Sequence, residues 1–205
     1  MKKEVRALAR SLEVRTSEAG ENIVSGYVVE FDKLSVDLGG FCEKVQAGAF
    51  ANSLKNNKRI KALWGHDKNI VLGSTNGKTL ELREDEKGLP FEIMLPNTTQ
   101  GRDYAESVRR GDVDGVSFGF SVIKDLWDDS NKASIVRTLL EVDLFEISLT
   151  AFPAYPSSSI TIRSSDEVLS EYRQAQESEF RKQETDLGLR LKIEKEKLKL
   201  KEREI

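Results

Sequence analysis

The sequence is poor in the residues from which metal sites and disulfides are built. It contains one histidine, His66, and one cysteine, Cys42, among 205 residues. This excludes a zinc site assembled from several His and Cys ligands, an internal disulfide, and any mechanism that needs two histidines. A single thiol fits a reducing compartment. If catalysis needs a base near neutral pH, His66 is the residue to expect.

Strong charge and long apolar runs are also lacking. The formal net charge is −3, so no basic field points to nucleic acid or to an acidic membrane. A membrane span needs a run of about 18 apolar residues, and the sequence has none. The charged start, Met1 to Glu4, is not followed by the apolar segment of a secretory signal. We therefore expect neither a nucleic-acid partner nor a membrane contact.

The composition changes near residue 164. Residues 166–205 are dominated by Glu, Lys, Arg and Gln, with 11 acidic and 10 basic residues. We expect a folded domain over 1–163, followed over 164–205 by a charged arm that is helical or partly disordered. The arm has a heptad-like series of apolar residues, but Glu194 and Lys201 occupy the alternate core positions of that heptad pattern. The arm is therefore either a helix that binds a partner or a second copy, or a solvated helix. The series is Phe180, Leu187, Leu191, Leu198 and Ile205.

Short strands dominate the first 163 residues, which predicts a mixed, mainly β fold. Two helices interrupt them, at 48–55 and 101–110, the second capped by 96–99 and ended by Gly111. Strands are expected at 4–16, 22–31, 41–45, 60–64, 89–95, 115–122, 135–140, 142–151 and 160–162. A hairpin is expected between 71–73 and 79–82 across Asn76-Gly77, and a rigid turn at 153–156.

The stretch Gly115 to Val122 has the clearest alternation in the chain. One face carries Val116 and Phe118 with two further apolar residues, and the other carries Ser117, Gly119 and a second serine, Ser121. The apolar face should pack into a core, and the small face should let another backbone approach closely. A serine set in such a strand is a candidate nucleophile if a base can reach it.

A base and an orienting acid can be named for that serine. His66 follows a predicted strand, with Gly65 before it, so its side chain can face a cleft. Period two places Glu146 on one face of the 142–151 strand with Ser148, and Asp143 on the other face, so at most one acid should face the site. Glu146 has hydroxyl neighbours on its own face, and a histidine that becomes cationic during catalysis would compensate its buried charge.

Other assignments stay open at this level. Asp67 is adjacent to His66, but neighbours in an extended chain point apart. Ser121 lies about 13 Å along the strand from Ser117, at roughly 3.3 Å per residue, so one histidine cannot serve both. Ser148 reads as a neighbour of the site. Cys42 and His66 would form a cysteine-type dyad, although a small buried thiol is the simpler interpretation of Cys42.

Taken together, the motifs resemble the tailed-phage prohead maturation protease family, which is similar to the herpesvirus assembly proteases. The resemblance is collinear from about residue 20 to 163, and its order and spacing make it specific. Residues 164–205 lie outside it. The segments that carry it are 26–31, 41–50, 63–67, 72–73, 88–89, 95–98, 115–120, 144–148 and 153–156.

The resemblance implies a closed β-barrel-like sheet flanked by helices and a serine endopeptidase without metal or cofactor. The family's nucleophile and base match Ser117 and His66. In the herpesvirus relatives the third catalytic residue is a second histidine, which this chain lacks. The resemblance therefore implies an acid as the third catalytic residue, and Glu146 lies at the corresponding position downstream of the serine. The implied substrate is the scaffolding segment of the major capsid protein, and the protease itself. The implied location is the host cytoplasm, inside an assembling procapsid. The alternative is a non-catalytic assembly or scaffolding protein that uses the barrel and the arm as interaction surfaces.

Overall fold

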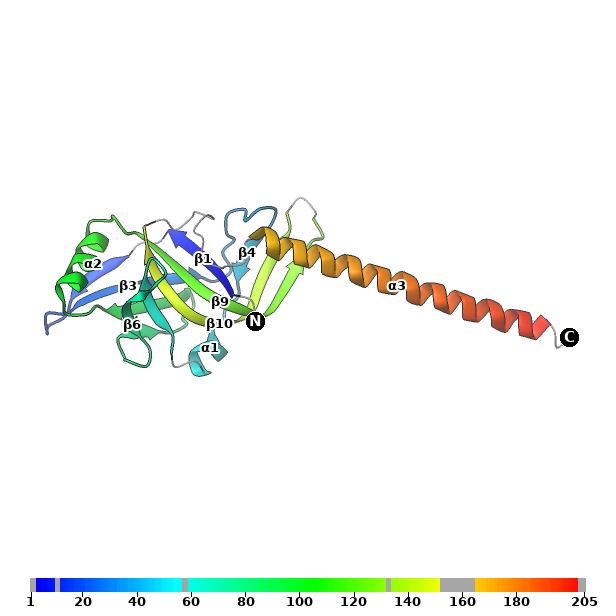
Figure 1. Cartoon of the computed structure of the whole chain (residues 1–205), viewed down its shortest axis with the longest axis horizontal. Helices are drawn as coiled ribbons and strands as arrows, with labels where there is room; N and C mark the ends of the chain where they lie inside the picture. Colours follow the sequence, from blue (N-terminus) through cyan, green and yellow to red (C-terminus); the bar gives the residue numbers. More distant parts are fainter. Residues whose placement is uncertain (1–2, 10–11, 57–58, 132–133, 152–164, 203–205) are drawn as a thin grey trace. The chain divides into compact units, whose positions relative to one another are not determined.

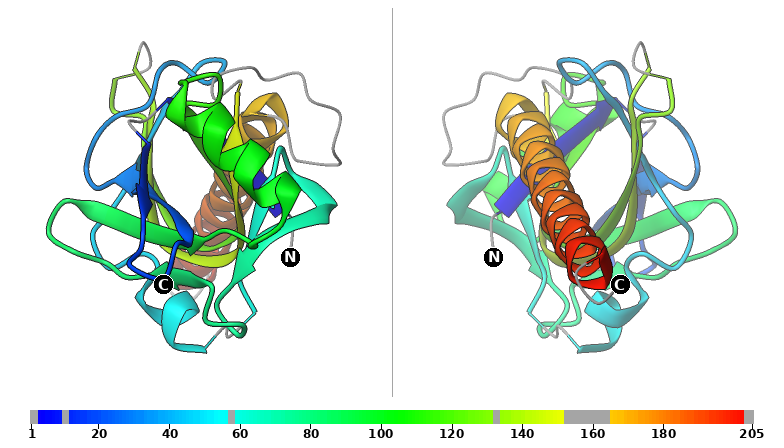
Figure 2. Two further views of the ribbon diagram at one scale, coloured as in Figure 1. Left: turned by 90° about the vertical axis from the view of Figure 1, so that its left-hand side faces the viewer. Right: turned by 90° about the vertical axis from the view of Figure 1, so that its right-hand side faces the viewer.

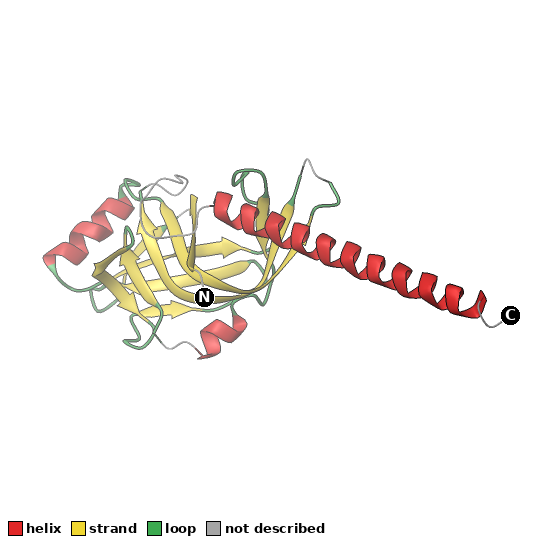
Figure 3. Cartoon of the chain, turned by 45° about the vertical axis from the view of Figure 1, so that its right-hand side comes forward, coloured by secondary structure: helices red, strands yellow, loops and turns green. Residues whose placement is uncertain are grey.

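The structure is a computed structural model that describes residues 3–9, 12–56, 59–131, 134–151 and 165–202. The chain divides into two compact units, Met1–Ser164 and Ser165–Ile205. Ten strands and two short helices make up the described part of the first unit, and one long helix makes up that of the second (Figures 1 and 3). The first unit is therefore a mixed, sheet-dominated fold with few helices.

The larger sheet is organised around two long strands, β9 (Gly115–Asp128) and β10 (Val136–Thr150). Its order is β1 (Lys3–Ala9), β9, β10, β5 (Lys61–Trp64), β6 (Asp67–Ser74), and β4 (Cys42–Val45) pairs with the other end of β10. β9 runs antiparallel to both β1 and β10, whereas β4 and β5 run parallel to β10. β10 thus has neighbours along its whole length, and β1 lies at the edge next to β9.

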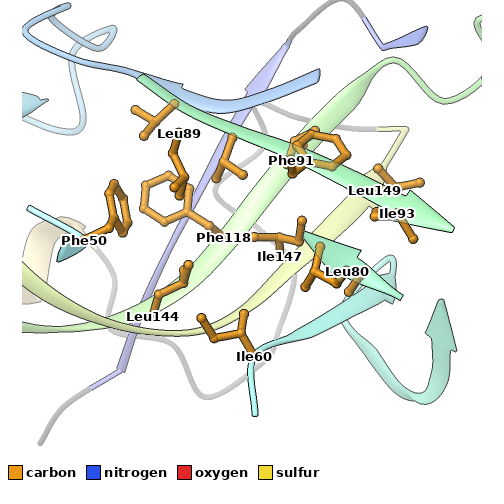
Figure 4. Packing of buried hydrophobic residues seen from close by; sticks show 14 of the residues in the cluster. Phe50, Ile60, Leu80, Leu89, Phe91, Ile93, Phe118, Leu144, Ile147 and Leu149 are labelled. Atoms are coloured by element: carbon orange, nitrogen blue, oxygen red, sulfur yellow. The ribbon is translucent and has the colours of Figure 1, made fainter. Parts of the chain in front are cut away.

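The smaller sheet has the order β2 (Glu13–Thr16), β3 (Asn22–Glu30), β8 (Gly88–Met94), β7 (Leu80–Leu82). β2 and β3 form a hairpin, with Gly20 at φ +82° in its turn. The apolar faces of the two sheets share one core (Figure 4). From the smaller sheet come Leu80, Leu89, Phe91 and Ile93, and from the larger come Val116, Phe118, Phe120, Leu144, Ile147 and Leu149. The predicted core face of the 115–122 strand is confirmed.

Both predicted helices are present. α1 (Ala51–Asn56) begins after Gly48, which has φ +88°. α2 (Thr99–Arg109) begins at Thr98, whose hydroxyl accepts a hydrogen bond from the Gly101 N–H at 3.0 Å, and ends before Gly111 at φ +77°. α2 packs on β2 and β3, and the left view of Figure 2 looks onto it at one end of the sheets. The capping signals in the sequence therefore placed α2 correctly.

The closed barrel is not supported. The described strands form two separate sheets, whose order ends at β1 and β6 in one and at β2 and β7 in the other. A barrel needs its first and last strands to pair so that no edge remains. Here the two sheets pack against each other through side chains, and both sheets contribute residues to the core.

Two local predictions were wrong for one reason, that neighbouring strands go to different sheets. The expected strand over 4–16 is two strands: β1 pairs with β9, whereas β2 pairs with β3. The expected hairpin across Asn76-Gly77 has its turn, but β6 pairs with β5 and β7 with β8. A turn dipeptide fixes a reversal of the chain but not the sheet that each arm joins. The turn at 153–156 and the strand at 160–162 lie outside the described residues.

The second unit is α3 (Ser165–Glu202), a single helix of 38 residues. Among its described side chains, Phe180 is a large apolar residue that is 63% exposed. None of the helices in the described ranges is both long enough and apolar enough to cross a membrane.

Gly101 gives a test of the close approach at the start of α2. A Cβ added there would stand 2.0 Å from the carbonyl oxygen of Pro96, which is backbone and cannot move freely. Glycine-to-alanine within a helix normally stabilises by about 1 kcal/mol. We expect Gly101→Ala instead to destabilise the protein by about 1–3 kcal/mol in urea unfolding. Gln100→Ala, an exposed neighbour, should change stability by less than about 0.5 kcal/mol. Stabilisation by Gly101→Ala would contradict the packing described.

Candidate active site

His66 lies at the tip of a tight hairpin between β5 and β6. Trp64 pairs with Asp67, so Gly65 and His66 are the two central residues of the turn. Their φ values are +57° and +64°, as a type I′ turn requires at both positions. The left-handed conformation costs a non-glycine residue roughly 1–2 kcal/mol. The turn is held in this conformation by a hydrogen bond from the Gly65 N–H to the Leu149 carbonyl at 2.9 Å.

Aromatic stacking fixes the strand end that carries this turn. The ring of Trp64, the last residue of β5, stacks on Tyr104 of α2 with centroids 4.3 Å apart. The parallel pairing of β5 with β10 sets Trp64 beside Leu149 and Leu63 beside Ser148. The hairpin tip therefore returns over the end of β10, which directs the imidazole toward that strand.

The imidazole meets Glu146 in a closed ring of three hydrogen bonds. His66 Nδ1 lies 2.9 Å from Glu146 Oε1. The Ser148 hydroxyl donates to Glu146 Oε2 at 2.7 Å and accepts from the His66 backbone N–H at 3.2 Å. The side chains of His66 and Glu146 are only 13% and 10% exposed, so water screens the pair weakly. A proton on Nδ1 bonded to the carboxylate leaves Nε2 of the neutral ring as an acceptor.

Ser117 lies directly across from Ser148 in the β9–β10 ladder, which brings it next to this ring. Its side chain is fully buried. Its hydroxyl donates to the carbonyl of Arg6 in β1 at 3.0 Å. Since a hydroxyl has one proton, Ser117 is not donating to His66 in this state. Two of the three predicted site residues are thus in direct contact, and the third is their neighbour across one strand pair.

The alternative residues are held elsewhere. Asp143 Oδ1 lies 3.4 Å from the hydroxyl of Ser53 in α1. The carboxylate of Asp67 accepts from the Asn69 backbone N–H at 2.8 Å, within its own strand. Ser121 pairs with Asp143, further along the ladder from the histidine. Cys42 pairs with Val136, at the opposite end of β10 from Glu146.

The alternation used to separate the two acids was wrong. The ladder shifts register between Leu144 and Glu146, so that they pair with the consecutive residues Phe120 and Gly119. Leu144 belongs to the core before the shift, and Ile147 and Leu149 belong to it after the shift. This β-bulge at Phe145 reverses which face each position takes. Glu146 does share a face with Ser148, as expected. Strict period two would also place Val142 and Leu144 on that face, but both lie on the opposite, core face.

Gly119 makes room for the acid. A Cβ at this position would lie 2.6 Å from Glu146 Oε1 and 2.6 Å from Phe145 Cε2. The small face of the 115–122 strand therefore accommodates the carboxylate and the bulged ring, whereas the sequence suggested an approaching backbone. Ser148 and the β1 carbonyl were not assigned roles from sequence. The one local indication of a role for Ser148 was its hydroxyl, two residues from Glu146 in a strand. Within the described residues, no group of three or more His, Cys, Asp or Glu side chains is arranged to hold a metal ion.

Replacing Ser148 tests the hydrogen-bond ring. Ser148→Ala removes a donor to a buried carboxylate and an acceptor for a backbone N–H, and a hydrogen bond to a charged group contributes about 1.5–3 kcal/mol. We expect a loss of that size in urea unfolding. The matched control is Ser121→Ala, a buried serine on the partner strand, with an expected loss under about 1 kcal/mol. Equal losses for the two variants would show that the ring has no special weight.

Comparison with known proteins places most of the first unit in one family. The chain is 33% identical over 146 residues to the prohead protease of Enterobacteria phage HK97, a match covering 71% of this chain and 61% of the relative. This chain therefore spans less than two thirds of that relative's length. It is also similar to the bacteriophage T4 capsid assembly protease, with 10% identity, a TM-score of 0.46, and coverage of 70% of this chain and 96% of the other. The model of the caudovirus prohead serine proteases matches residues 10–172, and the chain belongs to that family.

Proposed function

We propose that this chain is a serine endopeptidase of phage capsid maturation. In it Ser117 is the nucleophile, His66 the general base, and Glu146 the acid that orients the base. The observation that carries the proposal is the hydrogen bond of 2.9 Å between His66 Nδ1 and Glu146 Oε1. It holds the neutral imidazole in the tautomer whose Nε2 can take a proton.

The reaction would begin with a rotation of Ser117 about its Cα–Cβ bond, away from the Arg6 carbonyl and toward Nε2. His66 then takes the hydroxyl proton as Oγ bonds to the carbonyl carbon of the substrate. The proton passes to the leaving amine as the peptide C–N bond breaks, which leaves an acyl-enzyme. Water, deprotonated by His66 in turn, attacks the ester and restores Ser117. Backbone N–H groups are the donors expected for the oxyanion.

Glu146 would act by stabilising the imidazolium that forms in both steps. Its second oxygen is already occupied by Ser148 at 2.7 Å, so the carboxylate cannot swing away from His66 without breaking a buried hydrogen bond. The pair is shielded from water, which strengthens the attraction between imidazolium and carboxylate. The serine catalytic type that the family name implies fits these residues.

We propose as substrates the scaffolding segment of the major capsid protein and the protease itself, cleaved in the host cytoplasm within the assembling procapsid. The HK97 relative, named a prohead protease, supports this location. A non-catalytic assembly protein is the rival. A fluorophosphonate probe separates the two, because an unreactive binding module would leave Ser117 unlabelled.

Substitution of the three residues tests the mechanism. Ser117→Ala and His66→Ala should abolish removal of the scaffolding segment when the capsid protein is co-expressed. Glu146→Gln should lower the rate by about 10²- to 10⁴-fold, because it leaves the imidazole without its orienting charge. The matched control Asp143→Asn should retain activity within a few-fold. Circular dichroism of each variant checks folding.

Persisting scaffold removal in Ser117→Ala or His66→Ala would rule out this mechanism. A larger loss for Asp143→Asn than for Glu146→Gln would reassign the third residue.

We also propose that the arm, residues 164–205, makes scaffold or self-contacts and takes no part in chemistry. Its exposed apolar side chain, Phe180 at 63%, supports an interaction role. Deletion of 166–205 should leave peptide cleavage unchanged and reduce incorporation into proheads, measured by the protease content of purified particles. Unchanged incorporation would count against this role.

A further inference from the structure

The strand beside the nucleophile is the first strand of the chain. β1 pairs antiparallel with β9 over seven positions, Lys3 to Ala9 against Ser121 to Gly115, and lies at the edge of the sheet. The Ser117 hydroxyl is bonded to a β1 carbonyl, that of Arg6, and its side chain has no exposure. An extended peptide that approached Ser117 along the β9 edge would have to take the place of β1.

Two charged side chains hold β1 to the rest of the sheet through ion pairs. Glu4, 1% exposed, accepts from Arg137 of β10 at 2.7 and 3.2 Å. Arg6 donates to both oxygens of Glu43 of β4, at 2.7 and 3.0 Å. Arg137 also reaches Glu43 at 3.0 Å and Asp125 at 2.8 Å. The rest of the sheet thus offers a cation to Glu4 and an anion to Arg6.

Arg137 and Glu43 contact two alternate positions of the extended strand β1, Glu4 and Arg6. Glu4 and Arg6 are two residues apart, so both point to the same face, across from Phe120 and Phe118. Burial by itself lowers the pKa of Arg137. The hydrogen bond to Glu4 and the negative charges of Glu43 and Glu4 together raise this pKa by more than burial lowers it, so Arg137 stays cationic. A strand with an acid and a base in the opposite order would bring like charges together.

We infer that the β9 edge is a peptide-binding site for extended segments that carry an acidic residue two positions before a basic one, with Arg137 and Glu43 as its selective groups, and that β1 is the chain's own occupant of it. The inference rests on the proposed function of Ser117. Main-chain pairing would supply affinity and the two charges would supply specificity, as in strand addition to a sheet edge. β1 also lies before residues 10–172, the part that matches the family.

A disulfide across the ladder tests whether β1 covers Ser117. Lys3 and Ser121 face each other directly, so Lys3→Cys with Ser121→Cys, in a Cys42→Ser background, can pin β1 to β9. Fluorophosphonate labelling of the full chain should fall at least tenfold in the oxidised form and return on reduction. The control pair is Glu13→Cys with Ser25→Cys, which pins β2 to β3 and should leave labelling unchanged. Equal labelling of the oxidised and reduced forms would overturn the inference.

Loosening β1 gives the opposite result without a cross-link. Glu4→Gln removes one charge of its buried ion pair, and labelling should rise at least threefold. Arg15→Gln, which breaks an exposed ion pair with Glu92 in the other sheet, is the control and should not change it. A merely structural β1 would give unchanged or lower labelling with Glu4→Gln, which contradicts the proposal.

Peptides then test the order of charges. Fluorescein-labelled Lys-Glu-Val-Arg-Ala-Leu-Ala should bind the Glu4→Gln full chain at least tenfold more tightly, by anisotropy, than Lys-Arg-Val-Glu-Ala-Leu-Ala, which has the same composition. Equal affinities, or no binding of either, would overturn the inference. If Ser117 is not the nucleophile, no variant is labelled, yet the peptide preference still reports the site. Failure of the inference alone leaves Ser117 labelled equally in every variant.

Discussion

The antiparallel pairing of β9 with β10 is the constraint on which the rest of the first unit depends. It joins thirteen residue pairs, from Val136 with Asp128 to Thr150 with Gly115. One face of this ladder supplies Phe118 and Ile147 to the core between the sheets. The other face carries Ser117, Ser148 and Glu146. Because the same backbone pairs position both faces, core packing and site geometry cannot vary independently.

The bulge at Phe145 shows how one extra residue sets the chemistry. With strict alternation, Glu146 would share the core face of Leu144, where a carboxylate without a partner costs several kcal/mol. The shift in register turns it outward, toward the hairpin tip that carries His66. Gly119 leaves the space that this turn needs. The energetic cost of a buried carboxylate is thereby offset by His66 and Ser148 together.

Local signals in the sequence located most of the elements but did not determine their pairing. Alternation over 115–122 and the caps of α2 are short-range patterns, and both predicted what the structure has. The bulge in β10, the division of 4–16 between two sheets and the burial of Ser117 under β1 depend on contacts between distant residues, which no local pattern encodes. Because the chain has one histidine, the sequence predicts His66 as the partner of the acid, and the structure has the two side chains in contact. The choice of Glu146 rested on an alternation that the bulge breaks and on the family resemblance.

The position of β1 also sets an order of events during synthesis. Arg6 and Ser117 are 111 residues apart, so β1 leaves the ribosome long before the strand that it pairs with exists. Contacts of such long sequence separation close late in folding, after local hairpins such as β2–β3. The edge that carries the serine is therefore among the last parts of the sheet to be covered in a newly made chain.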